Sequence, residues 1–338
     1  MDKALNVKPE RHIKLGTLII IILLITILAA LVFGWFYWRK LDPAARLSPS
    51  FIHNTSSPPR YLFTISDQTA GGGLNKPLAV AADPDGRIFV ADTGDGVIKE
   101  FDPNGAYLRE FGKNHLHFPF QMTYAKGRLW VADPDLRKVQ VFDSDGKFIK
   151  TFVQSPAQPG GRQDAYLTPT AVAVSDSGEV YVADTAAQTI RVYDQNGREL
   201  RRIGHPGNDK DGLMYPNALW VAGNKVFVSD SNNARIQVYD LQGSFVQTLG
   251  GGRSQAAPLT MPRGITVSAS GQVLVVDVFT QVVRAFSQKG SLVWTLGEIG
   301  QNTDDNQGFN FPNGIWLDNS GKLYVTDREN NRVQVFKF

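Results

Sequence analysis

Six aspartates recur along the chain, each at the end of an apolar run and nine residues before an aromatic side chain. A ring of carboxylates could bind a metal ion, and this is the chemistry that their repetition first suggests. A residue present in every repeat is better explained by the repeat itself, because Asp can accept backbone N–H groups in a turn. We therefore interpret the six as structural caps: Asp92, Asp133, Asp184, Asp230, Asp277 and Asp327.

Histidines are few in residues 60–338, where only His115, His117 and His205 occur. A catalytic zinc ion usually takes three protein ligands, and His115 and His117 share one loop. The chain also contains no Cys, no G-x-S-x-G motif and no phosphate-binding loop. We therefore predict no catalytic residue, no bound metal and no cofactor. A metal-assisted lyase or hydrolase is the alternative.

The elements that position these residues are short strands. A Pro precedes each repeat Asp by 14 or 15 residues and begins an apolar run, as at LAVAA (78–82). Turn sequences such as DPDG (83–86) follow, and a second apolar run ends at the Asp. A third run carries the aromatic residue, and a Gly turn leads to a fourth. Four short antiparallel strands that recur at this period indicate the blades of a β-propeller.

The strand count predicts how the ring closes. The sixth repeat stops at Phe338 after its third strand, whereas RYLFTI (60–65) precedes the first repeat as an isolated strand. We expect this N-terminal strand to complete the last blade, because a closed ring has no open sheet edge. The fold class predicted is all-β, with a six-bladed propeller over residues 60–338.

Candidate binding residues are those that vary where the repeats are otherwise alike. The residues after each repeat Pro begin the innermost strands, on the face that we call the loop face. We call these the rim residues: Leu78, Phe120, Gln121, Thr170, Asn217, Arg263 and Asn313. Long loops between blades enter the same face, and such loops on a rigid scaffold commonly bind ligands. They add three candidates: Arg162, His205 and Arg253.

The segments PLAVAADPDGRIFVADTGDGVIKEF (77–101) and PNGIWLDNSGKLYVTDRENNRVQVF (312–336) resemble the NHL repeat. The resemblance covers about residues 60–338 and implies a six-bladed propeller. Members include bacterial sensor domains, RNA- or protein-binding modules and the peptidyl-hydroxyglycine amidating lyase. That lyase uses several His ligands around its channel, an arrangement that this sequence does not match. Arg235 and Arg332, five residues after their Asp, resemble the family's structural basic residue.

A membrane anchor is predicted before the repeats. Residues 15–38 contain no charged side chain and end in Trp35, Phe36, Tyr37 and Trp38, as a signal anchor with an interfacial aromatic belt would. Basic residues before this segment favour a short cytoplasmic tail, 1–14, with the propeller outside the cytoplasm of a single-pass plasma-membrane protein. Residues 39–59 contain four Pro residues and read as a linker.

The charge balance bears on the partner. Residues 1–60 carry 8 of the 35 Lys and Arg and 3 of the 32 Asp and Glu, so the repeat region has 27 basic against 29 acidic residues. A nucleic-acid-binding domain usually carries a net basic face, so RNA is a third choice. We predict a membrane-tethered, non-enzymatic scaffold or sensor that presents a propeller face to a protein, a peptide or a cell-envelope polymer.

Overall fold

The computed structural model describes residues 57–66, 73–155, 166–251, 258–299 and 308–338. The predicted tail (1–14), anchor (15–38) and most of the linker (39–59) lie outside these residues. Within the part of the chain that is described, no helix combines the length and the apolar composition needed to cross a bilayer. The backbone contacts separate residues 1–51 from residues 52–338, and every described residue belongs to the second unit.

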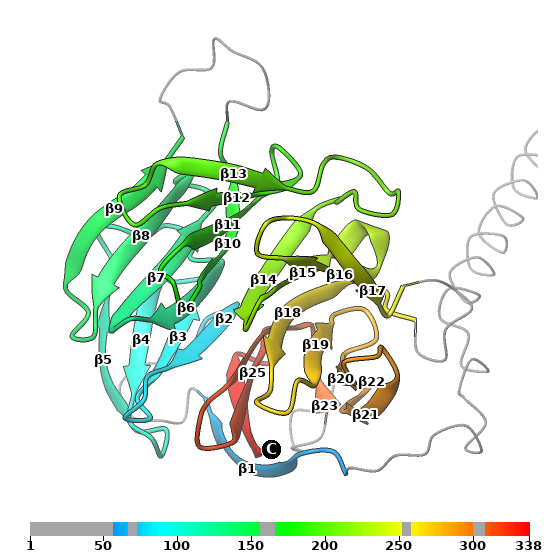
Figure 1. Ribbon diagram of the computed structural model, residues 1–338. Helices are drawn as coiled ribbons and strands as arrows, with labels where there is room; N and C mark the ends of the chain where they lie inside the picture. Colours follow the sequence, from blue (N-terminus) through cyan, green and yellow to red (C-terminus); the bar gives the residue numbers. More distant parts are fainter. Residues whose placement is uncertain (1–56, 67–72, 156–165, 252–257, 300–307) are drawn as a thin grey trace, which may run out of the picture. The chain divides into compact units, whose positions relative to one another are not determined.

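Six four-stranded antiparallel sheets make up the second unit (Figure 1). The first two blades contain β2 (Ala79–Ala82), β3 (Ile88–Asp92), β4 (Val97–Phe101) and β5 (Tyr107–Phe111), then β6 (Gln121–Ala125), β7 (Arg128–Asp133), β8 (Lys138–Asp143) and β9 (Phe148–Gln154). The third and fourth contain β10 (Pro169–Val174), β11 (Val180–Asp184), β12 (Thr189–Tyr193) and β13 (Glu199–Ile203), then β14 (Pro216–Ala222), β15 (Lys225–Asp230), β16 (Arg235–Asp240) and β17 (Phe245–Leu249).

The fifth blade contains β18 (Pro262–Val267), β19 (Val273–Asp277), β20 (Val282–Phe286) and β21 (Leu292–Leu296). The sixth contains β24 (Pro312–Leu317), β25 (Lys322–Asp327), β26 (Arg332–Lys337) and β1 (Arg60–Ile65). A 3-10 helix, η4 (Ser231–Asn233), follows β15, and a short parallel pair, β22 (Glu298–Ile299) and β23 (Gly308–Phe309), precedes the sixth blade.

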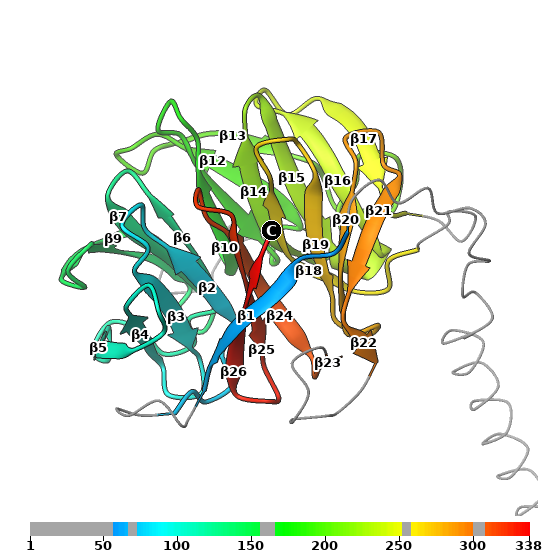
Figure 2. The same cartoon turned by 90° about the horizontal axis from the view of Figure 1, so that it is seen from below.

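The ring closes as the strand count predicts. Strand β1 pairs antiparallel with β26, so the N-terminal strand is the fourth strand of the last blade (Figure 2). The innermost strands contact one another in sequence around the centre, and β2 contacts both β6 and β24. The prediction of a six-bladed propeller completed by its N-terminal strand is confirmed.

The apolar core lies between the blades. The second and third strands are buried almost throughout, because both faces of each blade are covered by neighbouring blades. Aromatic rings bridge neighbours, as where Phe89 of the first blade stacks on Tyr124 of the second with centroids 5.8 Å apart. The outermost strands largely alternate half-buried and exposed positions, as period-2 strands with one solvent-facing side do.

The innermost strands of blades five, six and one approach closely because two of their residues are glycine. A Cβ atom on Gly264 would lie 2.5 Å from the carbonyl oxygen of Asn313. One on Gly314 would lie 2.6 Å from the carbonyl oxygen of Leu78. Rim residues from different blades therefore come together at the start of these strands.

Candidate functional site

The six repeat aspartates are fully buried and tie each blade to the loop that enters it. The Asp92 carboxylate accepts the Asn75 N–H at 2.6 Å, and Asp327 accepts the Asn310 N–H at 2.6 Å. From the sequence we expected N–H groups of the turn after each Asp to donate to its carboxylate. Those contribute in blades such as the second, where the Leu136 N–H donates to Asp133 at 3.0 Å. The preceding loop is the contact that recurs around the ring.

Five of these carboxylates also meet a cation on the third strand of their own blade. Arg235 and Arg332, singled out in the sequence, lie 2.7 Å from Asp230 and Asp327. Three further partners stand seven residues after the Asp and were missed, although this spacing recurs in the sequence. They pair as Lys99 with Asp92 at 2.6 Å, Arg191 with Asp184 at 2.5 Å, and Arg284 with Asp277 at 2.5 Å.

Burial dominates the electrostatics of two of these caps, Asp92 and Asp230. It raises the pKa of Asp92 to about 6, although the Lys99 ammonium opposes the shift. It also raises the pKa of Asp230, against its hydrogen bonds to the Met214 N–H and the Asn233 amide. The carboxylates are held by backbone groups and cations of their own surroundings, and this geometry accounts for their recurrence in every blade.

The rim residues meet at the loop-face end of the central channel. A shallow depression of about 10 Å³ opens there, with room for roughly one water-sized group. Six of the rim residues line it: Leu78, Phe120, Gln121, Asn217, Arg263 and Asn313. Thr170 does not, and its hydroxyl instead donates to the Pro216 carbonyl oxygen at 2.7 Å, which joins the third blade to the fourth.

Arg263 is the charged member of this group and is partly buried. Its guanidinium donates to the Asn217 Oδ1 atom at 2.8 Å and stands 5.8 Å from the centroid of the Phe120 ring. Asn217 is held in turn, because its Nδ2 donates to the Ser231 Oγ at 2.7 Å. A neutral amide therefore faces the guanidinium.

None of the three loop candidates lines the depression at the rim among the described residues. Arg162 and Arg253 lie outside the described residues. His205 is exposed, and its Nε2 lies 2.9 Å from the Asp209 Oδ2, an interaction that raises the pKa of His205. His205, Asp209 and Asp211 offer ligand atoms within 4.8 Å of one another, all on one exposed loop.

Exposed apolar side chains lie on the loop face at blades four, five and six. Met214 and Tyr215 precede β14 and are 39% and 41% exposed, Phe311 precedes β24 and is 39% exposed, and Phe279 follows β19 and is 50% exposed. We call these four residues the apolar collar. Tyr215 and Phe311 have φ angles of 60° and 50°, which bulky residues rarely adopt. Sequence reasoning missed the collar, although the residue before each repeat Pro varies as the rim residues do.

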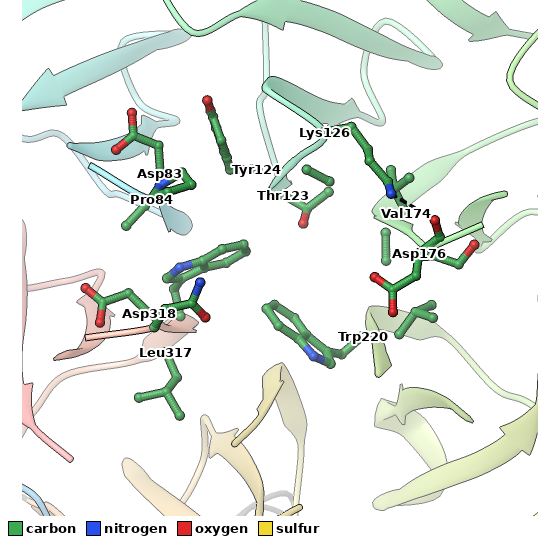
Figure 3. A pocket seen from close by; sticks show the side chains of 17 residues that line it. Asp83, Pro84, Thr123, Tyr124, Lys126, Val174, Asp176, Trp220, Leu317 and Asp318 are labelled. Atoms are coloured by element: carbon green, nitrogen blue, oxygen red, sulfur yellow. Dashed lines mark hydrogen bonds between the residues drawn. The ribbon is translucent and has the colours of Figure 1, made fainter. Parts of the chain in front are cut away.

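The opposite end of the channel holds a cavity of about 410 Å³. Trp220 and Trp316 stand in its wall with ring centroids 5.0 Å apart, and Figure 3 shows Trp220 between Lys126 and Asp176 on one side and Asp83 and Asp318 on the other. Sequence reasoning missed this cavity, because it placed the candidate site where the innermost strands begin.

Polar groups in the cavity wall have partners within the wall or the adjoining hairpins. The Lys126 Nζ donates to the Asp176 carbonyl oxygen at 2.8 Å. Asp83 accepts the Arg87 Nε–H at 2.8 Å, and Asp318 accepts the Tyr324 hydroxyl at 3.0 Å. These bonds stabilise the hairpin turns of the blades. The polar side chains of the cavity wall therefore have a structural role, which Arg263 at the rim lacks to the same degree.

Comparison with known proteins supports the fold and the repeat. The NHL repeat family matches residues 309–336, and a family described as a 6-bladed beta-propeller matches residues 164–250. Protein brain tumor of Drosophila melanogaster is 30% identical over 141 residues, which are 41% of this chain and 13% of that protein. Human NHL repeat-containing protein 3 is 26% identical over 189 residues, 51% of this chain and 53% of that protein. The chain thus spans about half, or much less, of these relatives.

Solved structures resemble the propeller at low sequence identity. A protein of unknown function from Bacteroides thetaiotaomicron has a TM-score of 0.66 at 16% identity, covering 81% of this chain and 75% of that one. A gluconolactonase from Xanthomonas campestris has a TM-score of 0.61 at 14% identity, covering 85% and 96%. A streptogramin B lyase has a TM-score of 0.58 at 14% identity, covering 82% and 87%. These likenesses show the fold alone. The chain is thus a six-bladed β-propeller with an NHL repeat at residues 309–336.

Proposed function

We propose that this protein is a membrane-tethered, non-enzymatic binding scaffold whose loop face receives a polypeptide partner. The observation that carries the proposal is the apolar collar of Met214, Tyr215, Phe279 and Phe311 on the loop face of blades four to six. Exposed apolar side chains gathered at one place mark interaction surfaces more often than isolated ones do. Aromatic residues in particular are enriched at protein interfaces.

The backbone of the collar supports this reading. Tyr215 and Phe311 keep left-handed backbone conformations at a cost in free energy that the surrounding structure must offset. The Gln188 side-chain oxygen accepts the Tyr215 N–H, so the preceding blade holds this conformation in place. Lys76 has the same conformation before its repeat Pro, with a φ of 51°, so this backbone belongs to the repeat, and at Tyr215 and Phe311 it carries a partly exposed aromatic side chain.

The uncharged segment 15–38 and the Pro-containing segment 39–59 supply the tether in this proposal. A single-pass anchor in the plasma membrane, with the N-terminus in the cytoplasm, would hold the propeller at the outer surface. A partner with affinity for the loop face would then be concentrated at the membrane.

The test compares capture by two double variants of the full chain. Tyr215→Ala with Phe311→Ala removes two collar rings. Leu108→Ala with Leu200→Ala removes two side chains of similar exposure, 50% and 39%, from the outer strands. Photo-crosslinking in membranes should show partners that disappear with the collar variant and persist with the control. The same crosslinked set from both variants would refute the proposal.

A metal-assisted lyase or hydrolase is the second candidate. The observation in its favour is the His205, Asp209 and Asp211 group, which could hold a cation on the loop face. Elemental analysis of the protein, purified without added metal, decides between the two. Near-stoichiometric zinc, lost with His205→Ala, would displace the scaffold proposal. RNA binding ranks third, and an affinity that falls steeply with salt would identify it.

A further inference from the structure

Arg263 differs from every other arginine that is partly or fully buried among the described residues. The others all lie within 4 Å of a carboxylate oxygen, as Arg191, Arg235 and Arg332 do with their blade aspartates. The same holds for the rest of that set: Arg87, Arg109, Arg201, Arg284 and Arg328. No carboxylate of the described residues comes within this distance of Arg263. Its hydrogen-bond acceptor is the neutral Asn217 amide oxygen.

The surroundings of Arg263 make a lone positive charge costly. Burial lowers its pKa, Tyr215 opposes the shift, and the guanidinium of Arg328 in the neighbouring blade adds to the lowering. A guanidinium carries five N–H donors, and one bond to Asn217 with a weak contact to the Met261 sulfur, 3.9 Å away, leaves most of them for other acceptors. A buried charge is normally paired, so the missing partner points to an anion from outside the chain.

We propose that Arg263 anchors a carboxylate of the polypeptide that docks on the loop face. The depression beside it admits about one water-sized group, so a carboxylate oxygen can enter while the rest of the ligand stays outside. Guanidinium matches carboxylate in both charge and planar geometry. The exposed collar on the same face suits the apolar side chains of a peptide. The inference rests on the proposed use of the loop face and adds the chemistry of its central contact.

The opposite cavity is the weaker candidate for such a contact. Its volume of about 410 Å³ suits a small molecule, but its one lysine, Lys126, already donates to the Asp176 carbonyl oxygen. The three aspartates in its wall would repel an anion. Of these two places, the rim is the one that combines a partly buried cation with donors left over.

The experiment measures binding of fluorescent peptides to the full chain in detergent. The probes are a Glu-containing hexapeptide with tyrosine and leucine, its Gln counterpart, and both peptides with free or amidated C-termini. Arg263→Gln is expected to weaken binding of the acidic peptide by tenfold or more, as loss of a charge-assisted hydrogen bond does. Arg263→Lys should weaken it less, because the charge stays and the fork is lost. Arg128→Gln removes the same charge from an exposed position at the start of β7 and should change nothing.

Peptide series and variants together decide the outcome. Weaker binding of the Gln peptide than of the Glu peptide identifies a side-chain carboxylate as the ligand. Weaker binding of the amidated peptide than of the free one identifies the C-terminal carboxylate. Either result, lost in Arg263→Gln, supports the proposal. Equal binding by Arg263→Gln, or equal losses in Arg263→Gln and Arg128→Gln, would overturn it. Tighter binding of inorganic phosphate than of acetate at Arg263 would overturn it as well, in favour of a phosphate ligand.

Thermal unfolding separates an anchoring role from a structural one. If Arg263 awaits an anion, Arg263→Gln should unfold no earlier than the wild type in chloride, and acetate should stabilise the wild type alone. A lower melting temperature for the variant, with no effect of acetate on either protein, would show that Arg263 has a structural role, in which it positions Asn217, and would overturn the anchoring role. If the collar variant loses peptide binding while Arg263→Gln keeps it, the loop face is the binding surface but Arg263 does not anchor a carboxylate.

Discussion

The ring of Tyr61 meets that of Phe336 edge-on, with centroids 6.1 Å apart, and the two residues are paired between β1 and β26. Residues from the two ends of the propeller sequence thus build one blade. Pairing of such distant segments costs loop-closure entropy and joins the last blade to the first strand, so the sixth blade reports on the closure of the whole ring.

Closure of the ring is tested at Ile65, which is fully buried at the end of β1. Ile65→Ala should lower the free energy of unfolding by about 3 kcal/mol, because it deletes apolar contacts between the last blade and its neighbour. Leu108→Ala, at a half-exposed position of β5, should cost less than about 0.5 kcal/mol. Urea unfolding checks both values. Equal costs would mean that β1 adds little to closure.

The ion pair between Arg332 and Asp327 provides a second prediction. Arg332→Gln leaves the fully buried Asp327 carboxylate without its cation and should destabilise the protein by about 3 kcal/mol. Arg202→Gln breaks an exposed pair with Glu199 and should cost less than about 1 kcal/mol. Adding Asp327→Asn to Arg332→Gln should recover part of the loss. No recovery in this double variant would argue against an electrostatic origin.

Asp92 makes stability depend on pH. Its folded pKa of about 6 lies above the ordinary value of 3.8, so the native state binds the proton more tightly than the unfolded state. The resulting stabilisation is complete below pH 3.8 and is lost as pH rises through about 6, a change of about 3 kcal/mol. Urea titrations of wild type and Asp92→Asn between pH 4 and 7 should differ in slope in this direction. Parallel curves would place the Asp92 pKa near its ordinary value.

Trp316 distinguishes the two mouths of the channel. It lies in the wall of the cavity opposite the collar and is 8% exposed. Trp316→Phe keeps an aromatic ring there and should leave capture by the loop face unchanged, at a modest cost in stability. Crosslinking of this variant beside the collar variant provides the measurement. Loss of the partner with Trp316→Phe alone would move the binding site to the cavity.

Much of the site could be predicted because a given repeat position lies at the same level along the channel axis in every blade. Phe120, Gln121, Asn217, Arg263 and Asn313 follow the repeat Pro, so a closed ring brings them to one mouth. Thr170 shares that position, yet it bonds the carbonyl oxygen of the next blade. Its role depends on side-chain direction and on a neighbour in another blade, which spacing along the chain does not specify.

Pairing was predictable only where it follows a familiar spacing. Arg235 and Arg332 stand five residues after their Asp and were identified, whereas Lys99 and Arg284 stand two residues further along the third strand. Positions two apart on a strand lie on the same face. A basic side chain at either position, five or seven residues after the Asp, can therefore extend to the carboxylate. The structure was needed to show that both solutions occur.

The sequence by itself determined the six blades and their closure, because the order of turn residues and apolar runs is a local property that repeats. It also determined which residues begin the innermost strands. Only the tertiary structure decided that Arg263 lacks a carboxylate partner among the described residues, that the collar side chains are exposed on the same face, and that a cavity opens at the other mouth. These features depend on distances between side chains of different blades, and such distances exist only once the ring has closed.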